Sequence, residues 1–335
     1  MRLLIITQSV DDQHPVLGFF VEWIKAFRAD SRIDSVDVIS FDNASMEIPG
    51  CTIHRINEAS KFRRVMAFRQ TISRLQTDVV FVHMTPIWLL AGSDIWKRQK
   101  AKMSLWYTHG SNSWPLRWAV RRSNVTFTAT AKAFPFASPK VAAIGHAIPP
   151  SFSSVVRRPS IDGTIRFLSV ARMMPRKRIV ETVEFFSRIH HIEPRSSLDL
   201  VGPTLGSDEY ALNVKKRIAD LELQDAIRII TDFRIADMPD AYASHDAFLH
   251  LSETGSLDKV VLEALASGCA VFSTNPATRD ALGDSWSYSG VLDDAAARIA
   301  IERAQKGVTE EERQRIIQAY SLSVLVTKIL DQLSK

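Results

Sequence analysis

Residues 252–271 have the sequence SETGSLDKVVLEALASGCAV, which predicts a loop, a helix and a short strand in succession. The helix carries one carboxylate, Glu263, and its neighbours at 260–262 and 264–265 are all apolar. An ionised side chain in such surroundings needs hydrogen bonds or an opposite charge. Two partners satisfy that need: the hydroxyl groups of a bound ligand, or a Lys or Arg packed nearby.

The loop before this helix contains turn residues, Thr-Gly-Ser at 254–256, which also favour a helix N-cap. Gly268 is placed to end the helix before a strand at 270–273. A flexible loop leading into a helix N-terminus is a favourable anion site. These residues suggest a phosphorylated ligand at the helix start, with its hydroxyl groups on Glu263; a Lys or Arg that pairs with Glu263 inside the domain core fits this stretch equally well.

Strand-like and helix-like runs alternate along all 335 residues, which predicts an α/β protein with parallel sheets covered by helices. The length suits two domains. A proline pair at 149–150, followed by a basic and polar stretch, marks the seam. The predicted domains are 1–150 and 151–320, and a C-terminal helix at 321–335 is expected to return to the first domain.

A second candidate anion site follows the predicted strand 165–170. Arg172 and Lys177 leave the carboxyl end of that strand and precede a helix, a favourable position for a diphosphate, although a basic surface loop has the same pattern. Gly202, after the strand 198–201, has a similar but weaker signal.

The composition limits the class of protein. The hydrophobic fraction is 46% and the charged fraction 24%, as in globular proteins, and two distant cysteines argue for a reducing cytosol. The first apolar run is too short and too early for a signal peptide, and no run suits a membrane span. No His, Cys and carboxylate set has metal-ligand spacing, so no metal is expected.

The net charge of +5 and the pI near 9.2 come partly from segments that mix Arg with aromatic residues. This mixture suits an anionic lipid surface, although a solvated face or a nucleic-acid site has the same composition. We prefer the membrane surface, and no nucleic-acid motif accompanies the charge. The predicted membrane or acceptor face comprises Arg63, Arg64, Trp114, Arg117, Trp118, Arg121 and Arg122.

Two histidines end predicted strands. His109 precedes Gly110, and a glycine there allows a ligand to approach closely. His83 is expected to be a buried structural residue.

Taken together, these motifs resemble the donor half of retaining glycosyltransferases of the GT-B fold, family 4. The resemblance rests on Arg172-x4-Lys177, on Leu200-Val201-Gly202 and on the segment ending LEALASGCAV. Further likeness covers both halves, over about residues 1–285. It lies in TQSVDDQHPVLGFF (7–20), LWYTHG (105–110) and KVAAIGHAI (140–148).

The resemblance implies two Rossmann-like domains facing across a cleft, the first for the acceptor and the second for a nucleotide-sugar donor. Arg172 and Lys177 would stabilise the leaving diphosphate, and His109 would contact the transferred sugar. Glu263 would accept hydrogen bonds from ribose hydroxyls. The implied donor-binding residues are Gly18, Gly202, Gly255, Ser256, Leu257, Asp258, Lys259 and Glu263.

Two departures from the family pattern concern the donor sugar. The family usually has a second glutamate eight residues before the position of Glu263, where this chain has Gly255; Glu253 and Asp258 are the nearby candidates to compensate. Ala171 and Arg178 stand where glycines usually flank the Arg-Lys motif.

The predicted function is therefore retaining, metal-independent transfer of a sugar from a UDP- or GDP-linked donor to a lipid-linked or cell-surface glycan precursor. The enzyme would need no cofactor besides this co-substrate. It would be cytoplasmic and peripheral at the inner face of the plasma membrane. The alternatives are a nucleotide-sugar 2-epimerase of the same fold, with Asp11 and Asp12 as candidate acids, and a non-catalytic nucleotide-sugar-binding relative.

Overall fold

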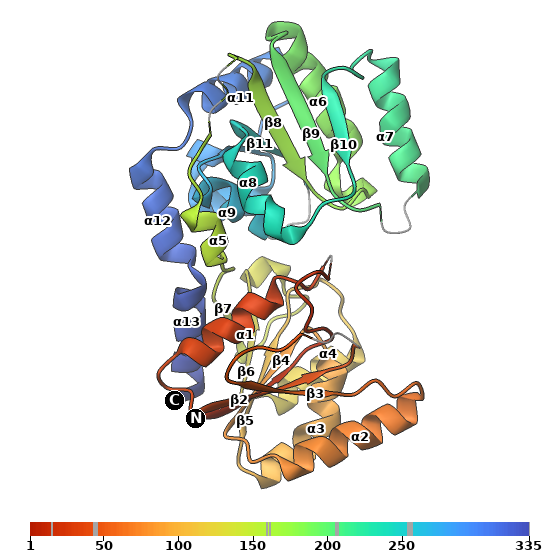
Figure 1. Cartoon of the computed structure of the whole chain (residues 1–335), viewed down its shortest axis with the longest axis vertical. Helices are drawn as coiled ribbons and strands as arrows, with labels where there is room; N and C mark the ends of the chain where they lie inside the picture. Colours follow the sequence, from red (N-terminus) through yellow and green to blue (C-terminus); the bar gives the residue numbers. More distant parts are fainter. Residues whose placement is uncertain are drawn as a thin grey trace. The chain divides into compact units, whose positions relative to one another are not determined.

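The computed structural model describes residues 1–14, 16–42, 46–158, 160, 162–204, 208–252 and 257–334. The chain divides into two compact units, of which the first comprises Met1–Ala147 with Leu322–Lys335 and the second Ile148–Ser321. Each unit contains one parallel sheet with helices packed on it (Figure 1). None of the helices in the described ranges has the length and hydrophobicity needed to cross a membrane.

The first unit is built on a seven-stranded parallel sheet of order β3-β2-β1-β4-β5-β6-β7. Its strands are β1 (Arg2–Ile6), β2 (Ser35–Ser40), β3 (Cys51–Arg55), β4 (Val79–His83), β5 (Lys102–Trp106), β6 (Val125–Thr128) and β7 (Val141–Ala143). Its helices are α1 (Phe20–Ala29), α2 (Lys61–Arg74), α3 (Pro86–Arg98), α4 (Trp114–Arg122) and α13 (Leu322–Ser334), with a 3-10 turn η1 (Ala131–Ala133). The order reverses between β1 and β4, because the chain first builds outward to β3 and then returns to the other side of β1.

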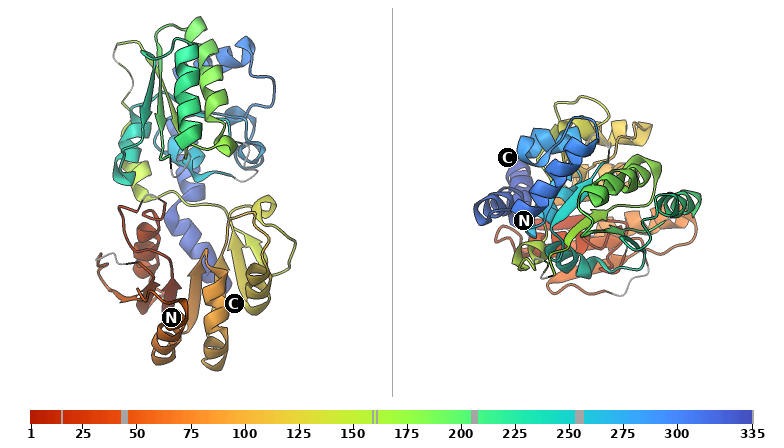
Figure 2. Two further views of the ribbon diagram at one scale, coloured as in Figure 1. Left: turned by 90° about the vertical axis from the view of Figure 1, so that its right-hand side faces the viewer. Right: turned by 90° about the horizontal axis from the view of Figure 1, so that it is seen from above.

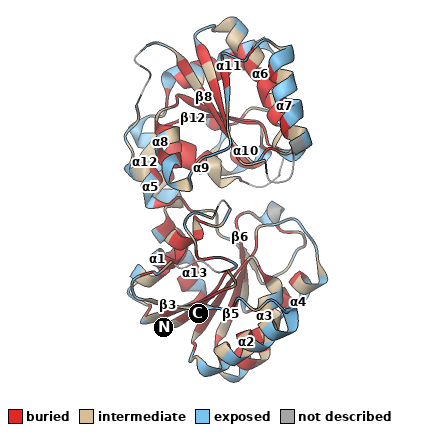
Figure 3. Cartoon of the chain, turned by 45° about the vertical axis from the view of Figure 1, so that its right-hand side comes forward, coloured by how far each residue is buried: buried red, intermediate tan, exposed pale blue. Residues whose placement is uncertain are grey.

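Alternate residues of β1 face opposite sides of this sheet, as the period of a strand requires. Leu3 and Ile5 belong to a core shared with α1 and α13. Leu4 and Ile6 belong to a separate core shared with α2, α3 and α4. Both faces of the inner strands β1, β4 and β5 are therefore buried, whereas the edge strands β3 and β7 contain no buried residue. Exposed residues lie mainly on the outer sides of the helices (Figure 3).

The second unit is built on a five-stranded parallel sheet of order β10-β9-β8-β11-β12. Its strands are β8 (Ile165–Val170), β9 (Ser196–Val201), β10 (Ile227–Ile230), β11 (Ala247–His250) and β12 (Ala270–Ser273). Its helices are α5 (Pro150–Ser154), α6 (Ile179–Ile192), α7 (Asp208–Asp220), α8 (Met238–Ala243), α9 (Lys259–Ala266), α10 (Pro276–Leu282), α11 (Asp294–Lys306) and α12 (Glu310–Tyr320). Three 3-10 turns complete it, η2 (Pro175–Lys177), η3 (Ile235–Asp237) and η4 (Asp284–Trp286).

The helices of the second unit pack in two groups, α6 with α7 and α11, and α9 with α5, α8 and α12 (Figure 2). Helix α9 has only Lys259 and Val260 outside the buried set, so almost all of it is enclosed. Arg313 of α12 fixes the end of α9 by donating to the Ala266 carbonyl at 2.7 Å. The same guanidinium donates to the carbonyls of Ser153 and Val155.

The chain enters and leaves the second unit side by side. The Ile148 amide donates to the Tyr320 carbonyl at 2.8 Å, and Ile148 forms a bridge with Ser321. After Ser321 the chain continues into α13, whose Leu325, Ile329 and Leu333 are buried in the core of the first unit.

Candidate functional site

The strand order of the second sheet brings two distant loops together. The chain runs outward from β8 to β10 and then returns to place β11 on the other side of β8. The loops that follow β8 and β11 are therefore neighbours at the carboxyl edge of the sheet, the point where ligands bind in open α/β sheets. The first loop carries Arg172 and Lys177, and the second leads to Asp258.

Lys177 and Asp258 meet at this point. The Lys177 Nζ lies 2.6 Å from Asp258 Oδ2 and 3.4 Å from the Ser252 hydroxyl. Both charged side chains are largely buried, with 16% and 18% of their surface exposed. The arrangement holds the ammonium group at one position beside the start of α9.

A histidine supports the carboxylate from the other side. His250 Nε2 donates to Asp258 Oδ2 at 3.0 Å, and its Nδ1 bonds the Ser273 hydroxyl at 2.9 Å. Ser273 in turn bonds the Thr278 hydroxyl at 2.9 Å. Burial by itself would raise the pKa of Asp258, but the hydrogen bonds and charges of His250 and Lys177 outweigh it, so the pKa lies well below its usual range.

His250 and Ser273 belong to this site, although the sequence analysis did not select them. Each is the last residue of an apolar strand, and the two strands, β11 and β12, are neighbours in the sheet. The sequence feature that could have identified them is a polar side chain at the carboxyl end of a buried strand. The same feature drew attention to His109.

Arg172 lies in the same loop as Lys177 but is exposed, and it has no hydrogen bond or ion pair within the described ranges. Gly202 sets the position of this loop. A Cβ at Gly202 would lie 1.8 Å from the carbonyl oxygen of Ala171, the residue before Arg172. The Ala171 amide also donates to the Val201 carbonyl at 3.0 Å. The glycine thus permits close packing of two loops, which does not itself require a ligand.

The backbone at Arg178 shows why glycine suits this position in the family pattern. It has φ +54° and ψ +45°, a left-handed conformation that glycine adopts at little energetic cost and other residues do not. This is the position at which the resemblance leads one to expect glycine.

The helix that follows Lys177 is α6, and two of its first amide groups are already occupied. The amides of Ile179 and Val180 donate to the Tyr210 hydroxyl at 3.1 and 3.3 Å. This helix start is therefore already capped by a side chain from α7, a contact between distant segments that local pattern does not reveal.

Glu263 is buried in α9, with 4% of its surface exposed. Lys259, one turn earlier, places its Nζ 3.0 Å from Glu263 Oε1, so an intrahelical cation is present as one of the two expected partners. That contact lacks hydrogen-bond geometry, and Oε1 accepts no hydrogen bond from the described residues. The nearby Tyr242 hydroxyl is also buried without a partner there, and burial and the Glu263 charge raise its pKa. The carboxylate therefore retains hydrogen-bonding capacity for a ligand.

Leu257 is buried and forms part of the core of the second unit. Gly255, Ser256 and Glu253 lie outside the described residues. Across the described ranges, no group of three or more His, Cys, Asp or Glu side chains is arranged to hold a metal ion.

In the first unit, His109 is exposed in the loop after β5, and its Nδ1 accepts the Ser111 amide at 3.0 Å. Gly18 packs closely against its own loop, since a Cβ there would lie 2.5 Å from the Asp12 carbonyl oxygen. The loop therefore requires glycine at this position without a ligand. His83 is buried and stacks on Phe20 with ring centroids 4.0 Å apart. Burial lowers the pKa of His83 to about 3, so this histidine is neutral at physiological pH.

The predicted membrane face divides into two parts. Four side chains of α4 are exposed at helical spacing and form one stripe, which we call the α4 stripe: Trp114, Arg117, Trp118 and Arg121. The Arg121 guanidinium lies 5.3 Å from the Trp118 ring centroid. Arg122 is exposed beside the stripe and reaches Ser93 of α3 at 3.3 Å.

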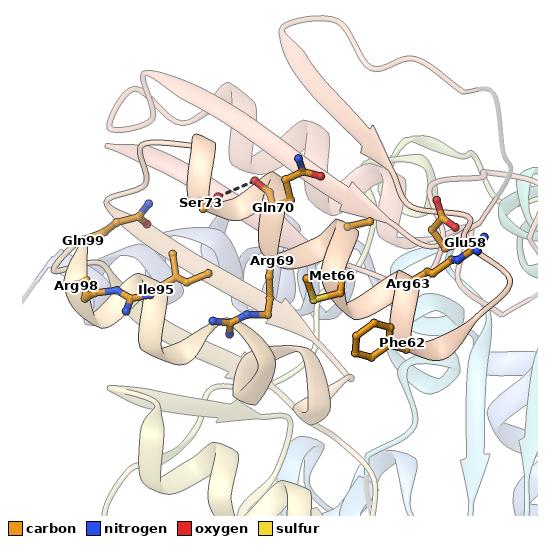
Figure 4. A pocket seen from close by; sticks show the side chains of 11 residues that line it. Glu58, Phe62, Arg63, Met66, Arg69, Gln70, Ser73, Ile95, Arg98 and Gln99 are labelled. Carbon is orange, nitrogen blue, oxygen red and sulfur yellow. Dashed lines mark hydrogen bonds between the residues drawn. The ribbon is translucent and has the colours of Figure 1, made fainter.

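The α2 part of this face comprises Arg63 and Arg64, whose side chains differ in their surroundings. Arg63 is exposed and lines a hollow of about 980 Å³ between α2 and α3, together with the exposed Phe62 and Met66 (Figure 4). Arg64 does not line this hollow, because its guanidinium donates twice to the Glu58 carbonyl, at 2.9 and 2.7 Å. Residues 63 and 64 are adjacent in a helix and project in different directions.

Residues 156–317, almost all of the second unit, match the family of glycosyl transferases group 1. None of the curated proteins matches the chain in sequence. Among solved structures, the chain is similar to Anabaena HepE in complex with UDP and glucose, at 17% identity and a TM-score of 0.75 over 100% of both chains.

Two further structures have the same architecture. A glycosyltransferase from Rickettsia africae has a TM-score of 0.75 at 16% identity, over 99% of this chain and 97% of the other. The UDP-forming α,α-trehalose-phosphate synthase of Burkholderia vietnamiensis has a TM-score of 0.71 at 12% identity, over 100% of both. The chain therefore has the GT-B fold of two Rossmann-like units, and its second unit matches the glycosyl transferases group 1 family.

Proposed function

We propose that the protein is a retaining glycosyltransferase that takes its sugar from a UDP- or GDP-linked donor. The observation that carries the proposal is the buried Lys177–Asp258 pair, at 2.6 Å, whose lysine shares a loop with the exposed Arg172. These groups lie in the segment that matches glycosyl transferases group 1. UDP bound to the similar HepE structure supports a nucleotide-sugar donor.

The proposed chemistry uses charge and position. The bond from the sugar to the diphosphate breaks, and an acceptor hydroxyl forms the new bond to the same carbon while its proton passes to the departing diphosphate. Lys177 and Arg172 stabilise the negative charge that grows on this leaving group. Two such cations supply the stabilisation that a metal would otherwise provide, and we propose metal-independent transfer.

Glu263 has a specific role in this proposal, which is to accept hydrogen bonds from the ribose hydroxyls. Wild type should bind UDP about 10- to 100-fold more tightly than 2′-deoxy-UDP, since hydrogen bonds to charged groups contribute this much. Glu263→Gln should bind both nucleotides with nearly equal affinity. Lys259→Met removes the intrahelical cation but keeps the carboxylate, so this variant should keep the preference for UDP. Equal discrimination in wild type and Glu263→Gln would reject this role.

A panel of UDP- and GDP-sugars tests the activity, with thermal shift and donor hydrolysis as readouts. If the protein is a transferase, the donor raises its melting temperature and is slowly hydrolysed to nucleoside diphosphate. A 2-epimerase would interconvert the donor with its epimer. A binding protein would show only the rise in melting temperature. The epimerase is less favoured, because Asp11 and Asp12 accept hydrogen bonds from Gln13 at 2.9 and 3.1 Å within their own loop. If no nucleotide sugar raises the melting temperature, the central proposal is wrong.

We further propose that the acceptor is a lipid-linked or cell-surface glycan precursor, bound by the first unit, and that the protein is peripheral at the cytoplasmic face of the plasma membrane. The α4 stripe supports this, since indole rings suit the headgroup region and Arg the lipid phosphates. Vesicles with anionic lipid should sediment wild type. Trp114→Ser with Trp118→Ser, which preserves charge, and Arg117→Glu with Arg121→Glu should both reduce sedimentation. Unchanged sedimentation of both variants would remove the stripe from the proposal.

A further inference from the structure

A second basic hollow lies in the first unit, at the edge where the strands begin. It has a volume of about 850 Å³ and is formed where α3 and α4 end and where β5, β6 and β7 start. The candidate residue His109 follows the opposite, carboxyl end of β5. The hollow is therefore separate from the His109 loop, but it shares Arg121 and Arg122 with the predicted membrane face. Its basic side chains are Lys97, Lys100, Lys102, Arg121, Arg122 and Lys140.

No carboxylate lines this hollow within the described part of the chain, and none of its six cations forms an ion pair there. The acids nearest in sequence are engaged elsewhere. Asp94 binds Arg69 at 2.7 Å and Arg98 at 3.2 Å, and Asp78 binds Arg2 at 2.7 Å. Six like charges facing one hollow repel each other, so an anion placed among them would be bound strongly.

Interactions with the C-terminal ends of helices explain the presence of only some of these cations. Lys140 donates to the carbonyls of Arg121 and Ser123, both at 2.7 Å, and so satisfies the end of α4. Arg121 and Lys97 are in the last turns of their helices, where cations interact favourably with the helix dipole. Lys100 and Lys102 follow the end of α3 and have no such explanation.

Lys100 lies just past the end of α3, and its φ is +58°. Its amide donates to the Lys97 carbonyl at 3.2 Å, and the Ala101 amide donates to the Trp96 carbonyl at 2.9 Å, so this left-handed residue closes the helix. Glycine favours this backbone conformation, and a long basic side chain stands there instead.

Polar contacts join the segments that line the hollow. The Met103 backbone amide donates to Asn124 Oδ1 at 2.8 Å, and the Asn124 backbone amide donates to the Met103 carbonyl at 2.8 Å. The Ser123 hydroxyl lies 3.1 Å from the Thr126 hydroxyl. The first two contacts tie β5 to the residue before β6, and the third ties the end of α4 to β6.

We propose that this hollow binds a ligand that carries two or more phosphate groups. Its volume is within the range of small-molecule sites, and Lys and Arg together suit phosphate oxygens. The phosphates come from a soluble polyphosphate ester or from clustered phospholipid headgroups. The proposal does not depend on the proposed donor site, which is in the other unit.

The test uses the full chain with two probes, inorganic tripolyphosphate by calorimetry and vesicles of phosphatidylglycerol with phosphatidylcholine by sedimentation. The variant Lys97→Gln, Lys100→Gln, Lys102→Gln should bind tripolyphosphate at least about tenfold more weakly, as three charge-assisted contacts are removed. The control Lys61→Gln, Lys215→Gln, Lys216→Gln removes the same charge from exposed positions and should bind like wild type. Thermal shift by UDP-sugars should be unchanged in both.

Vesicle sedimentation distinguishes phospholipid headgroups from a soluble polyphosphate ester as the ligand. A headgroup site predicts that the hollow variant loses vesicle binding and that tripolyphosphate competes with vesicles; a soluble ligand predicts unchanged vesicle binding. Lys100→Gly should raise the melting temperature while weakening tripolyphosphate binding. Wild-type affinity in the hollow variant, an equal loss in the control, or no tripolyphosphate binding by wild type would each overturn the proposal.

Discussion

Lys177 Nζ lies 2.6 Å from Asp258 Oδ2, although 81 residues separate them in the chain. The contact exists because β8 and β11 are neighbours in the sheet and the loops after them meet at one edge. Asp258 also bonds His250, so the carboxylate that positions the Lys177 ammonium group is itself positioned by a buried histidine.

Lys177→Met should lower the rate of donor hydrolysis and transfer by about 10²- to 10³-fold, the effect of removing one preorganised charge from a transition state. Arg176 provides the matched control, because it is an exposed cation in the same loop, and Arg176→Met should keep near-normal rates. Initial rates at saturating donor measure the difference. Comparable rates in the two variants would remove Lys177 from the leaving-group site.

Gly202→Ala should destabilise the second unit and displace the Arg172 loop. The added Cβ would meet the Ala171 carbonyl oxygen at 1.8 Å, so the backbone must move, at about 1–3 kcal/mol. Chemical denaturation and UDP titration measure the two effects. Gly110→Ala serves as the stability control, because a Cβ there has no neighbour within 4 Å. A Gly202→Ala protein with wild-type stability and UDP affinity would contradict this account of the glycine.

Arg178→Gly should leave stability unchanged or raise it by about 1 kcal/mol, because glycine relieves the left-handed backbone at φ +54°. The ion pair lost with Glu181, at 3.2 Å, is partly exposed and contributes about 0–1 kcal/mol. Arg176→Gly, in the same loop without positive φ, should show no such gain. A loss of more than about 1 kcal/mol on Arg178→Gly would mean that the side chain, not the backbone, matters there.

His83 should make the first unit sensitive to acid. Its pKa is about 3 in the folded protein against 6.5 in the unfolded chain, so protons bind preferentially to the unfolded state between these values. Stability is full above about pH 6.5 and falls as the pH drops toward 3, by up to about 1.4 kcal/mol per pH unit. His83→Phe, which can keep the stacking on Phe20, should flatten the decline of melting temperature between pH 6.5 and 4. An equally steep decline in the variant would show that other groups cause it.

Local pattern sufficed wherever a feature depends on neighbours in sequence. The alternation of apolar strands and amphipathic helices predicted two parallel sheets, because each element's periodicity follows from its own backbone. Local reasoning also selected Lys177, in a loop that follows a strand, and Glu263, a carboxylate among apolar helix residues, whereas Asp258 came from the family resemblance.

Contacts between distant segments required the tertiary structure. The strand order decided that Lys177 binds Asp258, that His250 orients the pair and that Tyr210 caps α6. Packing also decided that six cations from α3, α4, β5 and the loops before β5 and β7 surround one hollow. Periodicity is a property of a single element, whereas ion pairs and hollows depend on which elements become neighbours, and that depends on the packing of the whole unit.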